Sequence, residues 1–230
     1  MSKKYILTNE TKIFNGRTLH RIKAVKSFRD IHIGDLGGWI ESEYNLSQFE
    51  DCWIYDDAIV EGYARVYNNA IVEGTAWVYD CAHIFGNARV SNNSRVFNEA
   101  RVAGNARVLD NAQISGKAWV YDDAVVYDNA MIFEDATIYG NARVFGDIRL
   151  REYSRVGGNA EVSNDYDILY ISKIGKENGP ITFCRSRESI VVSHWYREPV
   201  DISVFEKLNK DDMEYQLAIK LARLRILEGE

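Results

Sequence analysis

The sequence predicts a mainly β protein whose central part is a solenoid of stacked parallel coils, flanked by a β cap and a small α+β domain. A six-residue unit repeats eighteen times without insertion between residues 58 and 162, and turn-forming residues complete most units. The period stops after residue 162. We expect an N-terminal β hairpin and cap over residues 1–50, the repeat region over 51–164, and strands plus two helices over 165–230.

In each six-residue unit the first residue is small, the third is aliphatic and the last two form a turn, whereas the second and fourth positions vary. Alanine takes the first position except at Ser94, Ile148 and Ser154, and valine, isoleucine or leucine takes the third. Residues two apart point to the same face of a strand, so both positions should point into one core. Gly, Asn and Asp, which are common at the last two positions, tolerate the left-handed backbone that a sharp corner needs. The unit therefore predicts short strands joined by corners, with successive coils sharing a core.

The residues also carry a family resemblance. Residues 102–107, Val-Ala-Gly-Asn-Ala-Arg, resemble the hexapeptide repeat of left-handed parallel β-helices, in which three units form one triangular coil. The resemblance supplies the handedness and the triangle, which the period alone does not, and implies about six coils. Residues 37–41, 45–47 and 51–56 look like a group of phage and prophage hexapeptide-repeat proteins, whose bacterial relatives are named as transferases.

The N-terminal part reads as β structure over residues 4–27, with a tight hairpin turn at Asn15-Gly16. In the glycine-rich segment 33–45 we expect a turn that lets Trp39 and Ile40 plug the open end of the solenoid, with a ligand loop as the alternative. Cys52 is in phase with the alanines and should be a small core residue.

The C-terminal part alternates as strands over residues 166–197 and then turns helical. Ser203 and Glu206 suit a capping box, and Asp211 and Asp212 suit the first turn of a second helix. One stripe of this helix has helical spacing and should pack on the strands or on the solenoid end, with pairing inside an oligomer as the alternative. The stripe consists of Met213, Leu217, Leu221 and Leu224.

Composition narrows the classes of function. The net charge is −6, and the first thirty residues carry eight Lys or Arg against Glu10 and Asp30, which leaves −12 for the remainder and argues against general nucleic-acid binding. The three cysteines have no metal-ligand spacing and give no disulfide framework. No apolar run is long enough to span a membrane and the N-terminus has no apolar leader segment, so we expect a cytoplasmic protein, in the host cytoplasm if it is phage-encoded.

If three units form a coil, residues eighteen apart stack, and the outer faces can be read from the sequence. The most aromatic and basic of them is the predicted ligand or interface face, and its surface favours a homotrimer and a protein partner. This face contains Arg65, Tyr67, His83, Phe85, Arg101, Trp119, Tyr121 and Tyr139. Four successive units also carry an arginine belt, Arg89, Arg95, Arg101 and Arg107. The belt could hold a small anionic ligand, with Arg101 between His83 and Trp119, or its arginines could lie over aromatic rings in solvent.

The sequence contains few residues that could form a catalytic site. Hexapeptide acyltransferases, by resemblance, use a histidine near a subunit interface, and His83 is the one histidine on the solenoid, so it is a weak candidate general base. Zinc chemistry on this fold would need three histidines, and we expect no metal and no cofactor. We therefore expect a non-enzymatic interaction scaffold, phage-encoded by resemblance, that binds a host or phage partner; a counter-defence inhibitor is one version. The alternatives are an acyl-CoA-dependent acyltransferase and a polymer-forming structural protein.

Overall fold

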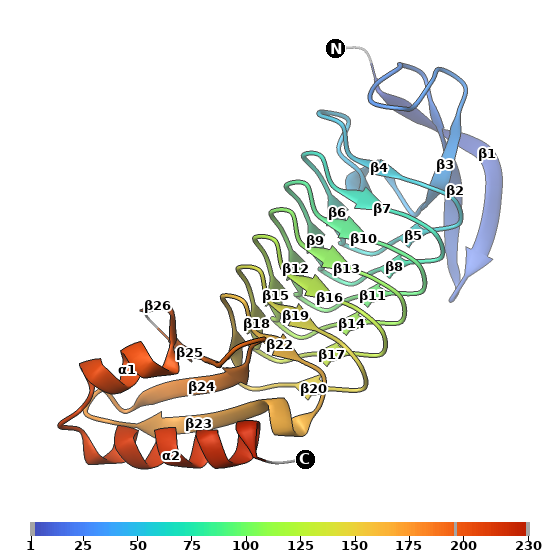
Figure 1. Ribbon diagram of the computed structural model, residues 1–230. Coiled ribbons are helices and arrows are strands. Elements are labelled where there is room, and N and C mark those ends of the chain that lie inside the picture. Colours follow the sequence, from blue (N-terminus) through green and yellow to red (C-terminus); the bar gives the residue numbers. More distant parts are fainter. Residues whose placement is uncertain (1–2, 196, 229–230) are drawn as a thin grey trace.

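The computed structural model describes residues 3–195 and 197–228, and it places a hairpin, a solenoid and a small α+β unit in a row (Figure 1). The N-terminal strands lie at one end of the solenoid, and the two helices lie at the other. The architecture is mainly β, with a parallel solenoid, an antiparallel sheet and two C-terminal helices, as the sequence predicts.

The N-terminal cap is continuous with one side of the solenoid. Strands β1 (Tyr5–Phe14) and β2 (Arg17–Ala24) form the predicted hairpin, and Asn15 and Gly16 take positive φ angles of 47° and 77° at its turn. Strand β2 pairs antiparallel with β3 (Leu36–Ile40), and β3 pairs parallel with the first strand of a solenoid sheet. A short 3-10 helix, η1 (Glu43–Asn45), follows.

The prediction that a turn lets Trp39 and Ile40 plug the open end is wrong in its details. Both residues lie in strand β3: Ile40 is in the solenoid core, whereas Trp39 packs outside it against Leu19 and Ile59. The end is filled by Trp53, whose ring meets those of Tyr5 and Phe28 edge-on, because the hairpin brings Tyr5 over the first coil.

Lys4 completes this end through hydrogen bonds. Its ammonium group is buried and donates to the carbonyl oxygens of Phe49, Glu50 and Cys52, at 3.3, 3.0 and 2.8 Å. Burial lowers the pKa of Lys4. Cys52 is buried in the core, as predicted.

The solenoid consists of two-residue strands that stack into three parallel sheets, each named here by its first repeat strand. The β4 sheet contains β4 (Trp53–Ile54), β7 (Ile71–Val72), β10 (Arg89–Val90), β13 (Arg107–Val108), β16 (Val125–Val126), β19 (Arg143–Val144) and β22 (Glu161–Val162). The β5 sheet contains β5 (Ile59–Val60), β8 (Trp77–Val78), β11 (Arg95–Val96), β14 (Gln113–Ile114), β17 (Met131–Ile132) and β20 (Arg149–Leu150). The β6 sheet contains β6 (Arg65–Val66), β9 (His83–Ile84), β12 (Arg101–Val102), β15 (Trp119–Val120), β18 (Thr137–Ile138) and β21 (Arg155–Val156). The described chain therefore makes six coils and begins a seventh, and its first strand, β4, lies one unit before residue 58 and within the predicted repeat region 51–164.

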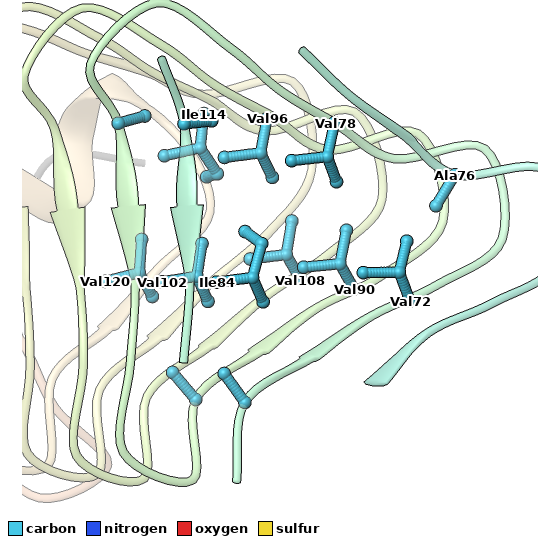
Figure 2. Close-up of a cluster of buried hydrophobic side chains, with 14 of the residues drawn as sticks. Val72, Ala76, Val78, Ile84, Val90, Val96, Val102, Val108, Ile114 and Val120 are labelled. Carbon is cyan, nitrogen blue, oxygen red and sulfur yellow. The ribbon is translucent and has the colours of Figure 1, made fainter. Parts of the chain in front are cut away.

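The aliphatic and alanine positions form the core. Val102 pairs in register with Ile84 and Val120, eighteen residues before and after it, and all three are fully buried. Figure 2 shows this row beside a second one made of Val72, Val90 and Val108. Burying one such side chain contributes roughly 1.5–3 kcal/mol, so the repeated pattern supplies most of the driving force for stacking.

The corners have one backbone conformation throughout. Every sixth residue from Asp56 to Gly158 has a positive φ, between 51° and 72°. Side chains of the next corner residues form ladders, in which the Asn87 amide donates to Asn105 at 3.0 Å and the Asn105 amide donates to Asp123 at 2.9 Å. The corner residues thus adopt the backbone conformation that the turn needs, and their side chains form hydrogen bonds with the corners of neighbouring coils.

The C-terminal unit packs two helices on a four-stranded antiparallel sheet. After the 3-10 helix η2 (Asp165–Asp167), the sheet contains β23 (Ile168–Ile174), β24 (Gly179–Arg185), β25 (Ile190–His194) and β26 (Arg197–Asp201), in that order. Helices α1 (Ile202–Leu208) and α2 (Met213–Leu227) share a core with the sheet, built around Phe183, Ile190 and Phe205.

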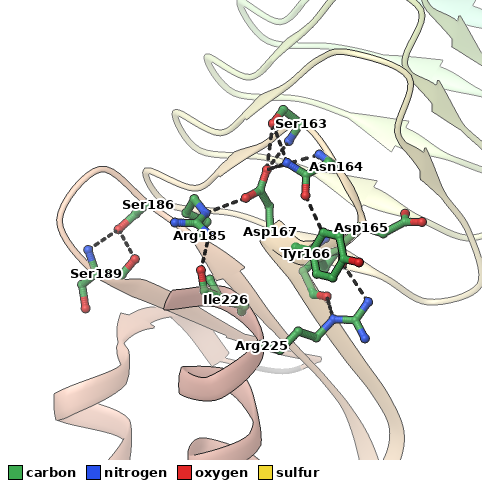
Figure 3. Close-up of polar contacts among 11 residues, drawn as sticks. Ser163, Asn164, Asp165, Tyr166, Asp167, Arg185, Ser186, Ser189, Arg225 and Ile226 are labelled. Carbon is green, nitrogen blue, oxygen red and sulfur yellow. Dashed lines mark hydrogen bonds and ion pairs between the residues drawn. The ribbon is translucent and has the colours of Figure 1, made fainter. Parts of the chain in front are cut away.

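Asp167 ties this unit to the last coil. Its buried carboxylate accepts hydrogen bonds from the backbone and side chains of Ser163 and Asn164 (Figure 3). It also forms an ion pair with Arg185 at a distance of 2.5 Å. Arg185 also donates to the carbonyl of Ile226 near the end of α2. One carboxylate therefore links the solenoid exit, the sheet and the last helix.

The predicted helix register is wrong. Met213, Leu217, Leu221 and Leu224 are all at least half exposed, and α2 instead packs through Tyr215, Ala218, Ile219, Ala222 and Ile226. Because alanines are small, the face that contains them can approach the sheet closely, and the helix packs through this face and not through the face with the larger leucines. The predicted capping box is also absent, because Asp201 caps α1 and Glu206 pairs with Arg223. Asp212 caps α2.

Candidate functional site

The outward residues of the β6 sheet, together with the residue two positions after each, form a surface that we call the β6 face. In-register pairing stacks its outward residues in the order Arg65, His83, Arg101, Trp119, Thr137 and Arg155. The second column contains Tyr67, Phe85, Ala103, Tyr121, Tyr139 and Gly157. The structure thus brings all eight residues of the predicted ligand or interface face onto one side of the solenoid.

The aromatic column is broken into two stacked pairs. Tyr67 and Phe85 stack with ring centroids 5.1 Å apart, and Tyr121 and Tyr139 stack at 5.5 Å, with Ala103 between the two pairs. The column ends at Gly157, where a Cβ atom would lie 2.4 Å from the Tyr139 ring. Tyr139 is only 5% exposed, so it supports the face more than it offers contact surface.

His83 lies in register between Arg65 and Arg101 and is half-buried. Burial, and then repulsion from Arg101 and Arg65, lower its pKa, so the ring is neutral at neutral pH. Its edge meets the Tyr67 ring at a centroid distance of 6.1 Å. Within residues 3–195 and 197–228 no hydrogen bond orients the His83 ring. The group is therefore a free base without the orienting partner typical of catalytic histidines.

The arginine belt does not converge on one point. Successive units lie on different sheets, so Arg89 and Arg107 lie on the β4 sheet, Arg95 on the β5 sheet and Arg101 on the β6 sheet. Arg89 forms an ion pair with Glu73 at 2.6 Å, and Arg95 lies 5.9 Å from the Trp77 ring. The belt therefore cannot grip one small anion with all four guanidinium groups.

Arg101 and Arg107 differ from these two. In the part of the chain that the structure describes, neither side chain makes a hydrogen bond or an ion pair, and both residues are exposed. Arg101 is thus the uncommitted cation of the β6 face, and Arg107 is its equivalent on another face.

The N-terminal end of the β6 face contains residues that the sequence analysis missed. The Arg65 guanidinium lies 5.0 Å from the ring of Tyr44, which η1 places there, and 5.7 Å from Tyr67. Arg65 and Tyr67 line an open pocket of about 500 Å³ together with Phe49. Tyr44 carries no repeat signal, whereas Arg155 at the other end could have been found by extending the spacing of eighteen from Thr137.

Among the described residues, no group of three His, Cys, Asp or Glu side chains could hold a metal ion. No helix in the described part of the chain is long and apolar enough to cross a membrane.

Comparison with known proteins gives matches confined to the repeat pattern or to part of the chain. Residues 64–80 match the family model described as YdcK β solenoid repeat. The chain is 33% identical over 79 residues to the uncharacterized acetyltransferase YdcK of Escherichia coli (strain K12), which covers 28% of this chain and 24% of that protein. The chain thus matches about a quarter of the length of this curated relative. The parallel solenoid and these two matches together support a hexapeptide-type β-helix.

Proposed function

We propose that the protein is a non-enzymatic binding scaffold of phage or prophage type, which assembles through the β6 face as a cytoplasmic homotrimer and presents its terminal domains or its other faces to a host or phage protein. The observation that carries the proposal is the composition of this face. It contains three arginines, a histidine, an exposed tryptophan and stacked tyrosines, and no acidic residue. Exposed aromatic and arginine side chains are enriched at protein interfaces.

The rigidity of the face favours binding. Its strands are held by backbone hydrogen bonds to the coils on both sides, as at Arg101, whose N–H donates to the Ala118 carbonyl at 2.9 Å. Docking on a surface that is already ordered costs little conformational entropy. Trp119, 39% exposed, supplies a large side chain that a partner can cover.

The distribution of charge favours an assembly in which a basic surface of one protomer contacts an acidic surface of the next. The corner between the β5 and β6 sheets carries exposed acidic side chains at Asp80 and Glu99, beside the basic β6 face. In a three-fold ring, each protomer uses two different surfaces, so the basic face of one copy can meet an acidic corner of the next.

The test compares two charge reversals at equivalent repeat positions. Arg101→Glu places an acidic group on the β6 face, and the control Arg107→Glu makes the same change on the β4 sheet. Native mass spectrometry should give a trimer for the parent protein and for Arg107→Glu, and monomers for Arg101→Glu. A monodisperse monomeric parent, or equal dissociation of both variants, would contradict the proposal.

A second candidate is an acyl-CoA-dependent acyltransferase with His83 as the base. It is favoured by the lowered pKa of His83 and by the name of the relative YdcK, an uncharacterized acetyltransferase. The uninterrupted coils between β4 and β22 argue against it, because they include no loop that could hold an acyl donor. Release of free thiol from acetyl-CoA with an amine acceptor, lost in His83→Gln but kept in the surface control His32→Gln, would favour this candidate.

A further inference from the structure

We propose that the cleft between the last solenoid coils and the C-terminal sheet binds a nucleotide-class ligand, that is, a planar heteroaromatic ring carrying one phosphate group. The cleft has a volume of about 870 Å³, which is in the range of small-molecule sites. It adjoins the β6 face, because Thr137 and Arg155 line the cleft and also belong to that face, whereas its other lining side chains come from the C-terminal unit and from the corner between the β5 and β6 sheets.

The cleft arises where two distant parts of the chain meet. Strand β24 contacts β21 and β22, and the backbone N–H of Arg155 donates to the Thr182 hydroxyl at 3.0 Å. This contact fixes the sheet against the end of the solenoid, where Figure 1 shows β23 and β24 extending away from the last coils. The corner residue Tyr153 and residues of the β23–β24 hairpin line the cleft.

Three aromatic rings line the cleft and remain accessible. Tyr153 is 60% exposed and Trp195 is 51% exposed, and Tyr170 is half-buried. Gly179 makes room for the Trp195 ring, because a Cβ atom there would lie 2.2 Å from the indole nitrogen. Accessible rings gathered in one cleft suit a planar heterocycle, which can stack on them whatever its hydrogen-bonding pattern.

Two cations of the cleft have no acidic partner. Arg155 and Lys173 both line it, and neither forms an ion pair within the described residues. The Arg155 guanidinium lies 4.8 Å from the Tyr139 ring, and its buried Nε atom has no acceptor among those residues. A phosphate in the cleft would bind the terminal guanidinium nitrogens of Arg155 and the Lys173 ammonium group rather than this buried atom, through charge-assisted hydrogen bonds.

The acidic side of the cleft limits the charge of the ligand. Glu134, Asp135 and Glu152 also line it, and the Glu134 carboxylate accepts the backbone N–H of Glu152 at 2.7 Å. Exposed carboxylates suit ribose hydroxyl and exocyclic amino groups and repel additional phosphates. We therefore expect a monophosphate to bind better than a triphosphate.

The experiment is isothermal titration calorimetry of the full chain with AMP, GMP, CMP and UMP, and with the matching nucleosides, ATP and inorganic phosphate. We expect at least one monophosphate to bind at one site per chain, more tightly than its nucleoside or inorganic phosphate. Trp195→Ala and Lys173→Gln should each weaken it about 5- to 100-fold. Trp119→Ala, which removes the exposed tryptophan of the β6 face, should leave the affinity unchanged.

The proposal fails if no monophosphate binds at about 1 mM or below. It also fails if inorganic phosphate binds as tightly as the nucleotide, or if Trp119→Ala weakens binding as much as Trp195→Ala. Thermal melting of each variant checks its fold, and both substituted cleft residues are exposed. Because loss of affinity in a folded Trp195→Ala variant requires contact in the cleft, it distinguishes this site from the rest of the surface.

Discussion

Helix α2 offers two apolar faces, and one pair of substitutions decides which of them holds the C-terminal unit together. Ile219 is fully buried against the sheet, whereas Leu221, two residues later, is 50% exposed. Both residues lie well inside the helix, so replacing either with alanine leaves the backbone and its hydrogen bonds intact. The two substitutions remove similar apolar groups from opposite sides of one element.

The expected effects differ severalfold. Ile219→Ala should lower the free energy of unfolding of the C-terminal unit by roughly 2–5 kcal/mol, because it leaves a cavity beneath the helix. Leu221→Ala should change it by less than about 0.5 kcal/mol. With a urea dependence of about 2 kcal/mol per M, a loss of 3 kcal/mol moves the midpoint down by about 1.5 M.

Urea titration followed by helical far-UV circular dichroism reports on this unit, because both described α-helices lie in it. The assay thus follows the C-terminal unit even if the solenoid unfolds separately. A midpoint that falls as far for Leu221→Ala as for Ile219→Ala would refute the packing of α2 described here. So would an Ile219→Ala variant with an unchanged midpoint.

Three further outcomes are expected elsewhere in the chain. Val102→Asp buries a charge between two coils and should abolish the cooperative thermal melt, which differential scanning calorimetry would detect. NMR titration should give His83 a pKa below its ordinary 6.5; Arg101→Gln should raise it and Arg107→Gln should not. Since the folded state then binds fewer protons than the unfolded state, His83 costs stability as pH falls below about 6.5. Glu152→Asn should stabilise the protein against urea by about 0.5–1 kcal/mol, because glutamate there has a φ of 57°.

The repeat region was predictable because its information is local and repeated. Each unit specifies a buried small residue, a buried aliphatic residue and a corner, and the same pattern recurs at every level of the stack. The spacing of eighteen then places residues such as His83 and Arg101 on one face without any knowledge of the rest of the fold. The same rule shows why the arginine belt diverges, since residues six apart belong to different sheets.

The ends were less predictable because their packing depends on partners far away in the sequence. Trp53 has the same spacing as outward repeat residues, yet it is buried because Tyr5 and Phe28 cover it. In α2, leucines of the expected stripe are larger than Ala218 and Ala222, but only the face with alanines fits closely on the sheet. Periodicity identifies an apolar face and does not say which neighbour receives it.

The two proposed surfaces can be separated because each has its own exposed tryptophan. Trp119 lies on the β6 face, and Trp195 lies in the cleft beside the C-terminal sheet. If both proposals are correct, Trp119→Ala should weaken assembly in native mass spectrometry and keep nucleotide binding, and Trp195→Ala should do the reverse. Arg155 belongs to the β6 sheet and also lines the cleft, so its substitution would mix the two effects. Parallel loss of both properties in both tryptophan variants would mean that one surface serves both, against the separation argued from the geometry.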